Sequence, residues 1–176
     1  MRSRRLALVA LTLVLAAARS GIAGTSAELL RCQKMLHTRA TTYMKLVQTS
    51  LTNCAYRQES CLLAQEIDGD DPTLCIDGAL KACVASLGKI TVTKAATIEK
   101  VLLACLLIPP DELAQSVAGL SFATAACPTG SPGDLVPCVF DAVQCAAERT
   151  VFALDPRAAV ALDNVGVGDF FPCVGP

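Results

Sequence analysis

Apolar residues recur with a helical period along residues 26–67, a stretch that contains neither Gly nor Pro. The recurring apolar positions are Leu29, Cys32, Leu36, Tyr43, Val47, Leu51, Cys54, Cys61 and Leu62. Their steps of three, four and seven residues place them on one side of a helix. The opposite side carries the bases Arg31, Lys34, Arg39, Lys45 and Arg57. The pattern predicts one amphipathic helix, or two joined end to end, with a solvated basic face rather than a binding patch for an acidic partner.

The residues that follow predict a turn and a second helix. Residues 69–72, Gly-Asp-Asp-Pro, interrupt the helical pattern. Asp71 is placed to cap the next helix, and Pro72 suits its first position. We expect this second helix to end near Leu87, because Gly88 supplies a C-terminal stop.

The second half of the chain predicts further helices. The expected segments are a helix over residues 91–108 that could begin as an extended strand at 90–93, a short helix over 110–118, a loop at 128–132, a helix over 134–153 and one or two turns at 157–163. The interior is rich in Ala and poor in aromatic residues, which suits closely packed helices. The sequence therefore predicts an all-α bundle of about four to five helices.

The first 23 residues have the features of a signal peptide. Three arginines precede the apolar run of residues 6–18, and the small residues Gly21 to Ala23 suggest cleavage before Gly24. A membrane anchor is less favoured, because a spanning helix needs about 20 apolar residues and Arg19 interrupts this run. The general secretory route and the twin-arginine route both remain open. We expect residues 24–176 to form a single domain in the periplasm or outside the cell, with no membrane span after leader removal.

Removal of the leader makes the protein acidic. The whole chain has 15 Lys and Arg against 16 Asp and Glu, and four of the arginines lie in the leader, so 11 bases remain and the net charge is −5. Nucleic-acid binding depends on neutralising phosphates with a basic surface. The chain also has no Trp and only two Tyr and five Phe on which bases could stack. Nucleic acid is therefore not an expected partner.

Ten cysteines behind an export signal predict disulfide bonds. Cys54 and Cys61 lie seven residues apart on the first helix, and Cys75 and Cys83 lie eight apart on the next. An antiparallel helical hairpin around residues 27–87 would bring both pairs together. We therefore predict the disulfides Cys61–Cys75 and Cys54–Cys83.

The remaining six cysteines are less determined by their spacing. Cys127 is close to Cys138 across a loop rich in Gly and Pro, so we predict that these two are joined. Cys32 and Cys54 would lie about 33 Å apart on a continuous helix and cannot pair with each other. The sequence leaves the partners of four cysteines open, namely Cys32, Cys105, Cys145 and Cys173.

Several short motifs suggest a family resemblance. They are Arg31-Cys32-Gln33-Lys34 at the start of the first helix, Cys54 later in it, Cys105 at the end of a lysine-bearing helix, and Pro137-Cys138 with Cys145 in an Ala-rich helix. In this order they resemble an uncharacterised group of secreted, cysteine-rich helical proteins of environmental bacteria. The resemblance implies a bacterial exported protein, and it carries over no catalytic residue.

The sequence offers no catalytic, cofactor or metal motif, so we predict that the protein is not an enzyme and needs no cofactor. The single histidine, His37, lies within the first helix without a signalled nucleophile, so a structural or solvent-facing role is expected. Four acids, Glu66, Asp68, Asp70 and Asp71, could supply oxygen ligands for calcium. Their spacing differs from an EF-hand, and capping and a polar turn explain them more simply.

Two functions from different classes remain. The favoured one is a structural or protein-interaction module with an unknown protein partner. The alternative is a carrier of a small apolar or lipid-like ligand held between helices, for which residues 102–108 could line the space. Plain core packing explains that aliphatic stretch more simply.

Overall fold

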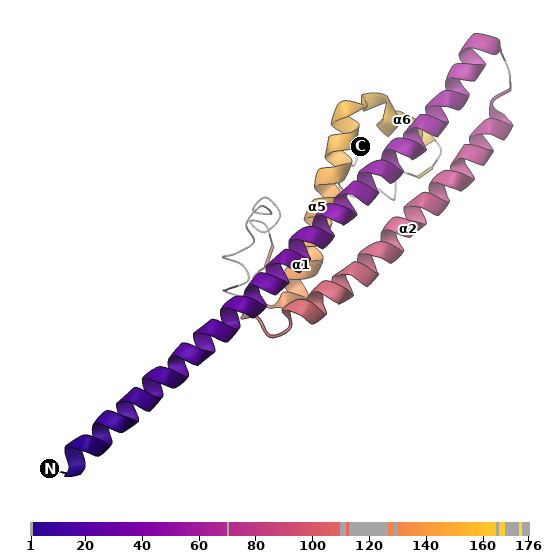
Figure 1. Ribbon diagram of the computed structural model, residues 1–176. Helices are drawn as coiled ribbons and strands as arrows, with labels where there is room; N and C mark the ends of the chain where they lie inside the picture. Colours follow the sequence, from indigo (N-terminus) through magenta and orange to yellow (C-terminus); the bar gives the residue numbers. More distant parts are fainter. Residues whose placement is uncertain are drawn as a thin grey trace.

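The computed structural model describes residues 2–69, 71–109, 112, 127–128, 130–164, 166–167 and 173, with side chains from residue 27 onward. This part of the chain contains four helices and no strand. They are α1 (Arg2–Asp68), α2 (Thr73–Cys105), α5 (Pro132–Leu154) and α6 (Pro156–Asn164) (Figure 1). The all-α class predicted from the sequence is confirmed. The part of α1 that precedes residue 24 is the segment predicted to be a leader.

Helices α1 and α2 form a long antiparallel hairpin that three disulfides join. The pairs are Cys61–Cys75, Cys54–Cys83 and Cys32–Cys105, with Cα–Cα distances of 5.7, 4.9 and 4.9 Å. These distances lie in the normal range for disulfides. In each pair the two cysteines are equally far along the chain from Asp68, to within one residue. One antiparallel register therefore accounts for all three bridges.

Helix α2 is longer than the sequence suggested. It continues through Gly88 to Cys105, so the predicted stop at Gly88 and the separate helix over residues 91–108 are both wrong, as is the extended alternative at 90–93. The reason lies in packing, because Leu87, Ile90 and Val101 continue one buried face through that point. A glycine within a helix costs about 1 kcal/mol relative to alanine, which burial of these side chains outweighs. The hairpin thus extends beyond the predicted limit at residue 87.

Capping explains where the helices begin. Asp71 lies one residue before the N-cap of α2, which is Pro72, and not at the cap as predicted. Its Oδ1 accepts a hydrogen bond of 2.9 Å from the Thr73 N–H. Helix α5 begins two residues earlier than expected, because Ser131 accepts a hydrogen bond from the Asp134 N–H and Pro132 follows it at the first position. The predicted loop before α5 is present in its described residues, and the predicted last turns form α6.

Helices α5 and α6 pack against the hairpin and complete the core. Tyr43 of α1 and Phe140 of α5 meet edge to face with ring centroids 5.5 Å apart. Leu36, Leu51 and Leu135 are also fully buried in this core. In Figure 1 the turn end of the hairpin extends past α5 and α6, and no described residue from 62 to 78 is buried.

Two further disulfides attach chain segments to α5. Cys127 bridges to Cys138 and Cys173 bridges to Cys145, with Cα–Cα distances of 5.6 and 5.1 Å. All ten cysteines are therefore paired. Five disulfides indicate a protein of an oxidising compartment. No helix among the described residues is both long and apolar enough to cross a bilayer.

Candidate functional site

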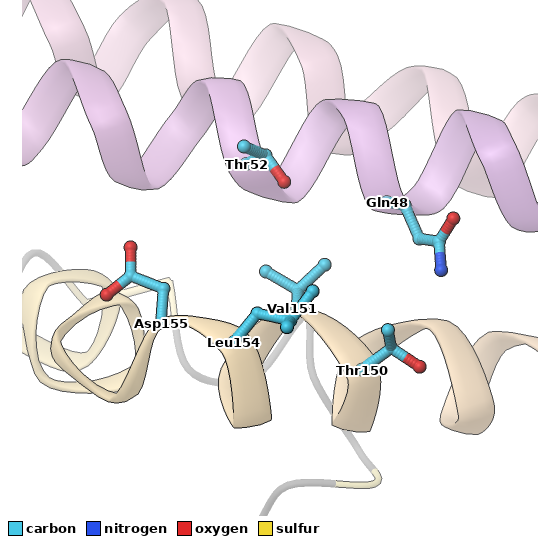
Figure 2. Close-up of a pocket in the computed structure, with 6 residues that line it drawn as sticks. All are labelled: Gln48, Thr52, Thr150, Val151, Leu154 and Asp155. Carbon is cyan, nitrogen blue, oxygen red and sulfur yellow. The ribbon is translucent and has the colours of Figure 1, made fainter.

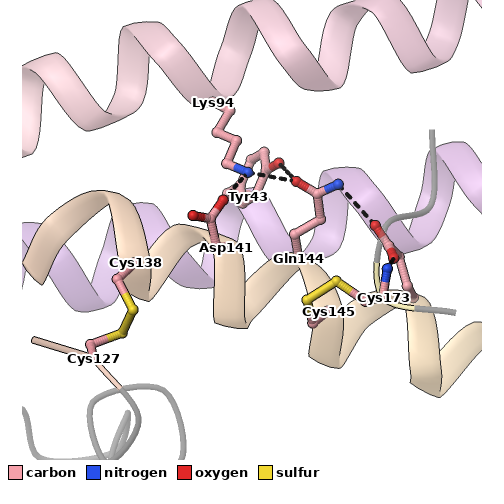
Figure 3. Close-up of polar contacts among 9 residues, drawn as sticks. Tyr43, Lys94, Cys127, Cys138, Asp141, Gln144, Cys145 and Cys173 are labelled. Carbon is pink, nitrogen blue, oxygen red and sulfur yellow. Dashed lines mark hydrogen bonds and ion pairs between the residues drawn. A yellow bond between two sulfur atoms is a disulfide. The ribbon is translucent and has the colours of Figure 1, made fainter. Parts of the chain in front are cut away.

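A chain of polar side chains joins α1, α2 and α5 beside the core (Figure 3). The Tyr43 hydroxyl donates to Gln144 Oε1 at 2.9 Å, and Lys94 Nζ donates to the same oxygen at 2.8 Å. Lys94 also pairs with Asp141. Gln144 Nε2 in turn donates to Glu148 Oε1 at 2.8 Å. We call these five residues the polar network.

The polar network also contacts Cys173, near the C-terminal end of the sequence. The backbone N–H of Cys173 donates to Glu148 Oε2 at 3.3 Å, close to the Cys145–Cys173 bridge. Both Glu148 oxygens therefore have donors. Because Glu148 is only 1% exposed, a carboxylate at this position requires such partners.

Burial changes the titration of two members of the network. Burial raises the pKa of Glu148, while the hydrogen bonds from Gln144 and Cys173 oppose that rise. Burial likewise raises the pKa of Tyr43, and the nearby carboxylates of Glu148 and Asp141 raise it further. Every donor and acceptor pairing named here is internal to the fold, so the network joins α1, α2 and α5 to one another and to Cys173.

The turn end of the hairpin has a strongly acidic sequence. From residue 58 to residue 80 the chain has no Lys or Arg but six acids, Glu59, Glu66, Asp68, Asp70, Asp71 and Asp77. The rest of the hairpin, residues 27–57 and 81–105, holds nine bases and only two acids, Glu28 and Glu99. The described tip acids apart from Glu59 are exposed. The turn end of the hairpin is thus acidic, and the rest of the two helices is basic.

Exposed apolar side chains lie beside these acids on α1. Tyr56, Leu63 and Ile67 are 69, 47 and 78% exposed. Their spacing of seven and four residues places them on one side of α1, opposite its buried face. We call these three residues the tip surface. Apolar side chains gathered on one face and surrounded by polar groups are typical of interaction sites.

A groove of about 340 Å³ lies between α1 and the end of α5 (Figure 2). Gln48 and Thr52 line it from α1, and Val151 and Leu154 from α5. Asp155 closes one end, but its Oδ1 already accepts from backbone N–H groups at the start of α6. Asp155 is therefore already engaged by the fold, whereas the side chains of Gln48 and Thr52 border the groove from α1.

A second groove, of about 630 Å³, lies along the start of the described side chains of α1. Leu30 and Met35 contribute apolar surface, and Arg31, Lys34 and Arg39 contribute positive charge. Apolar side chains beside three basic side chains suit an amphiphile with an anionic head.

The structure joins the cysteines that the sequence paired. Cys54 bonds to Cys83, Cys61 to Cys75 and Cys127 to Cys138. The four cysteines that the sequence left open form Cys32–Cys105 and Cys145–Cys173.

Other expected features take ordinary positions. His37 is exposed on α1. The acids considered for calcium form no group of three potential ligands among the described residues, and Asp70 lies outside those residues. Residues 102–108 do not line an enclosed space as the carrier hypothesis suggested, because Leu103, Leu106 and Leu107 are 70 to 75% exposed. Within the short helix expected at 110–118, the structure describes only residue 112, and this residue is helical.

No pattern within a single helix indicates the polar network as a whole. Tyr43 and Gln144 are 101 positions apart, and Glu148 resembles any surface acid of an Ala-rich helix. A periodicity analysis of α5 could have placed Glu148 among the inward positions Val143, Ala147 and Val151.

Comparisons with protein-family models, with curated proteins and with solved structures found no match to this chain.

Proposed function

We propose that this chain is an exported structural module that engages another protein through the turn end of its hairpin. The single observation that supports this function is the tip surface, which lies on the side of α1 opposite its buried face and which no described residue covers. Three disulfides along the hairpin keep the two helices in fixed register. A preorganised surface loses little conformational entropy on binding, which favours recognition.

The chemistry of the tip surface specifies the kind of partner. Tyr56, Leu63 and Ile67 lie within 12 residues, which rise about 16 Å along the helix. Tyrosine is enriched among residues that dominate binding energy. Glu66 and Asp68 border the apolar side chains with negative charge. The best-matched partner is a protein with an apolar strip flanked by Lys or Arg.

Site-specific cross-linking tests this interaction. A photoreactive amino acid at Ile67 should capture one predominant partner in cells that export the protein, and Tyr56→Ala with Leu63→Ser should abolish the product. A matched control carries the same group at Val160, which is 62% exposed on α6. Products that are the same from both positions, or that persist in the Tyr56→Ala and Leu63→Ser variant, would refute the proposed tip surface.

Export to the periplasm or the medium is part of the proposal. The leader-like sequence and the fully paired cysteines support it. Intact mass of the mature protein should correspond to residues 24–176 with ten hydrogens missing through five disulfides. A mass that retains the first 23 residues would remove the cleaved leader from the proposal.

Carriage of a lipid-like ligand is a second candidate, which the groove with Arg31, Lys34 and Arg39 favours. A fluorescent fatty acid should then bind, and Arg31→Gln with Lys34→Gln should weaken binding. Native mass spectrometry of protein purified from the exporting cells should show a ligand adduct. Absence of both the adduct and the fluorescence change would eliminate the carrier function.

A further inference from the structure

Helix α2 has a second apolar face that nothing in the described chain covers. Leu74, Val92 and Leu103 are 85, 71 and 71% exposed, and Leu106 just after the helix is 70% exposed. Leu74 and Val92 are 18 residues apart, which is five turns, and Val92 and Leu103 are 11 apart, about three turns. These side chains therefore lie in line along α2. We call this line of residues the outer face.

The outer face is directly opposite the side that packs against α1. Val92 lies nine residues from both Cys83 and Val101, which is two and a half turns in either direction. Cys83 and Val101 are 1 and 0% exposed. In Figure 1, α2 forms one edge of the molecule, and α5 and α6 lie towards α1.

Two glycines on the outer face have no explanation within one molecule. A Cβ at Gly78 or Gly88 would meet nothing within 4 Å. Neither has a positive φ, so neither is needed for the backbone conformation. Glycine within a helix is less stable than alanine. Gly88 lies one turn before Val92, where it leaves space for a side chain from another helix.

The charged residues at the centre of the outer face are complementary. Lys81 and Glu99 are both exposed and lie 18 residues apart, again five turns. They are equally distant from position 90, one on each side. Gly88 and Val92 are also equally distant from position 90, as are Leu74 and Leu106.

We propose that two copies of this chain pack antiparallel through their outer faces, with a two-fold axis level with position 90 of α2. In this register Lys81 of each copy faces Glu99 of the other, which gives two ion pairs. Val92 of each copy packs over Gly88 of the other, and Leu74 packs against Leu106. A two-fold interface requires such self-complementarity, because each residue and its match belong to the same surface.

Electrostatics favour this arrangement over a parallel one. A parallel pair would place Lys81 against Lys81, Glu99 against Glu99 and the two acidic tips side by side. The antiparallel pair places each acidic tip near the basic end of the second copy, which carries Arg31 and Lys34. Like charges in contact disfavour one mode, and opposite charges favour the other. The proposal goes beyond the function assigned above and leaves the tip surface on α1 free.

Charge reversal tests the register. Lys81→Glu alone and Glu99→Lys alone should each weaken dimerisation on the order of tenfold, since each creates two like-charge contacts. The double variant Lys81→Glu/Glu99→Lys should restore the affinity of the unmodified protein. Lys45→Glu is the matched control, because Lys45 is exposed on α1 away from this face.

Gly88→Leu provides a test that separates dimerisation from folding. A leucine at position 88 enters open space in one molecule and improves helix propensity, so the melting temperature of the monomer should rise. The same side chain would occupy the place of Val92 from the second copy, so dimerisation should be lost.

Sedimentation equilibrium of the exported protein and its variants, with disulfides intact, measures dimerisation from low micromolar to several hundred micromolar protein. Thermal unfolding followed by circular dichroism measures the melting temperature of Gly88→Leu. A concentration-dependent dimer with restored affinity in the double charge variant supports the proposal. A monomer across the whole range overturns it. So does a dimer that Gly88→Leu and both single charge variants leave unchanged, or a dimer that the Tyr56→Ala and Leu63→Ser variant abolishes.

Discussion

Removing the Cys32–Cys105 disulfide should destabilise the protein more than removing the tip disulfide, Cys61–Cys75. The change is a double substitution to alanine in each case, so that no free thiol is left to exchange. The difference follows from the position of each bridge in the hairpin. Cys54–Cys83 stays intact in both variants. In the unfolded chain it separates the loop closed by Cys61–Cys75 from the loop closed by Cys32–Cys105.

The magnitude follows from the loops that each bridge closes in the unfolded chain. With Cys54–Cys83 intact, Cys32–Cys105 closes two segments of 22 residues, about 44 in all. The chain-entropy relation then gives a stabilisation of about 4 kcal/mol at 25 °C. Cys61–Cys75 divides the loop of 29 residues into two of about 15, and the same relation gives about 3 kcal/mol for a loop of that size.

Burial increases the difference in the same direction. Cys32 and Cys105 are both fully buried, whereas Cys75 is exposed. Replacing the buried pair by alanine also removes packing contacts and leaves a small cavity. The variant Cys32→Ala/Cys105→Ala should therefore lose at least about 1 kcal/mol more than the variant Cys61→Ala/Cys75→Ala.

Urea unfolding followed by far-ultraviolet circular dichroism measures the free energy of unfolding of both variants and of the unmodified protein. The tip variant, Cys61→Ala/Cys75→Ala, is the matched control, because it loses the same number of atoms and one disulfide. An equal loss in the two variants, or a greater loss in the tip variant, would refute the reasoning from loop size and burial.

Three further predictions concern buried polar side chains. Gln58 is 1% exposed, and its amide has no hydrogen-bond partner among the described residues. Gln58→Met should therefore stabilise the fold by about 1 kcal/mol and raise the melting temperature by about 2–4 °C. A lower melting temperature would show that the amide is satisfied. Gln144→Leu should cost about 2–4 kcal/mol, more than Tyr43→Phe, because it leaves Tyr43, Lys94 and Glu148 without a shared partner; equal losses in urea unfolding would contradict this. Burial raises the pKa of Glu148, so the folded state binds the Glu148 proton more tightly than the unfolded state does. The contribution of Glu148 to the free energy of unfolding therefore increases as pH falls from the raised pKa to the ordinary value of 4.5. The free energy of unfolding relative to Glu148→Gln should therefore increase from pH 7.5 to pH 5, and a constant difference would exclude this coupling.

The hairpin could be predicted because its determinants are local. The helical period of α1, the turn at residues 69–72 and the spacing of four cysteines define an antiparallel pair and its register. The same register also specifies Cys32–Cys105, but the predicted end of the second helix at Gly88 separates Cys105 from the hairpin. The low helix propensity of one glycine predicts that end, whereas the buried face that continues across Gly88 determines the observed length of α2.

The 22-residue intervals between cysteines have a structural explanation. Cys32 to Cys54 and Cys83 to Cys105 are both 22 residues, close to six turns of helix. Equal intervals on the two helices keep both bridges on the facing sides. The equal interval from Cys105 to Cys127 has no such role, because Cys127 bonds to Cys138 on α5.

The candidate sites depended on information that a single sequence does not contain. The polar network joins residues from α1, α2 and α5, and no pattern in any one of these helices indicates the other two. The tip surface is different in kind. Tyr56, Leu63 and Ile67 share a helical face, but they are visible as a surface only when the other side of α1 is known to be the buried one.

The paired intervals of the hairpin restrict how its length can change. One residue inserted between Cys32 and Cys54 would rotate Cys32 by about 100° and move it about 1.5 Å along the axis, away from Cys105. A matching insertion between Cys83 and Cys105 could restore the axial position but would turn that cysteine as well. Only insertions of whole turns made in both helices together would preserve every bridge, so the two helices can lengthen or shorten only as a pair.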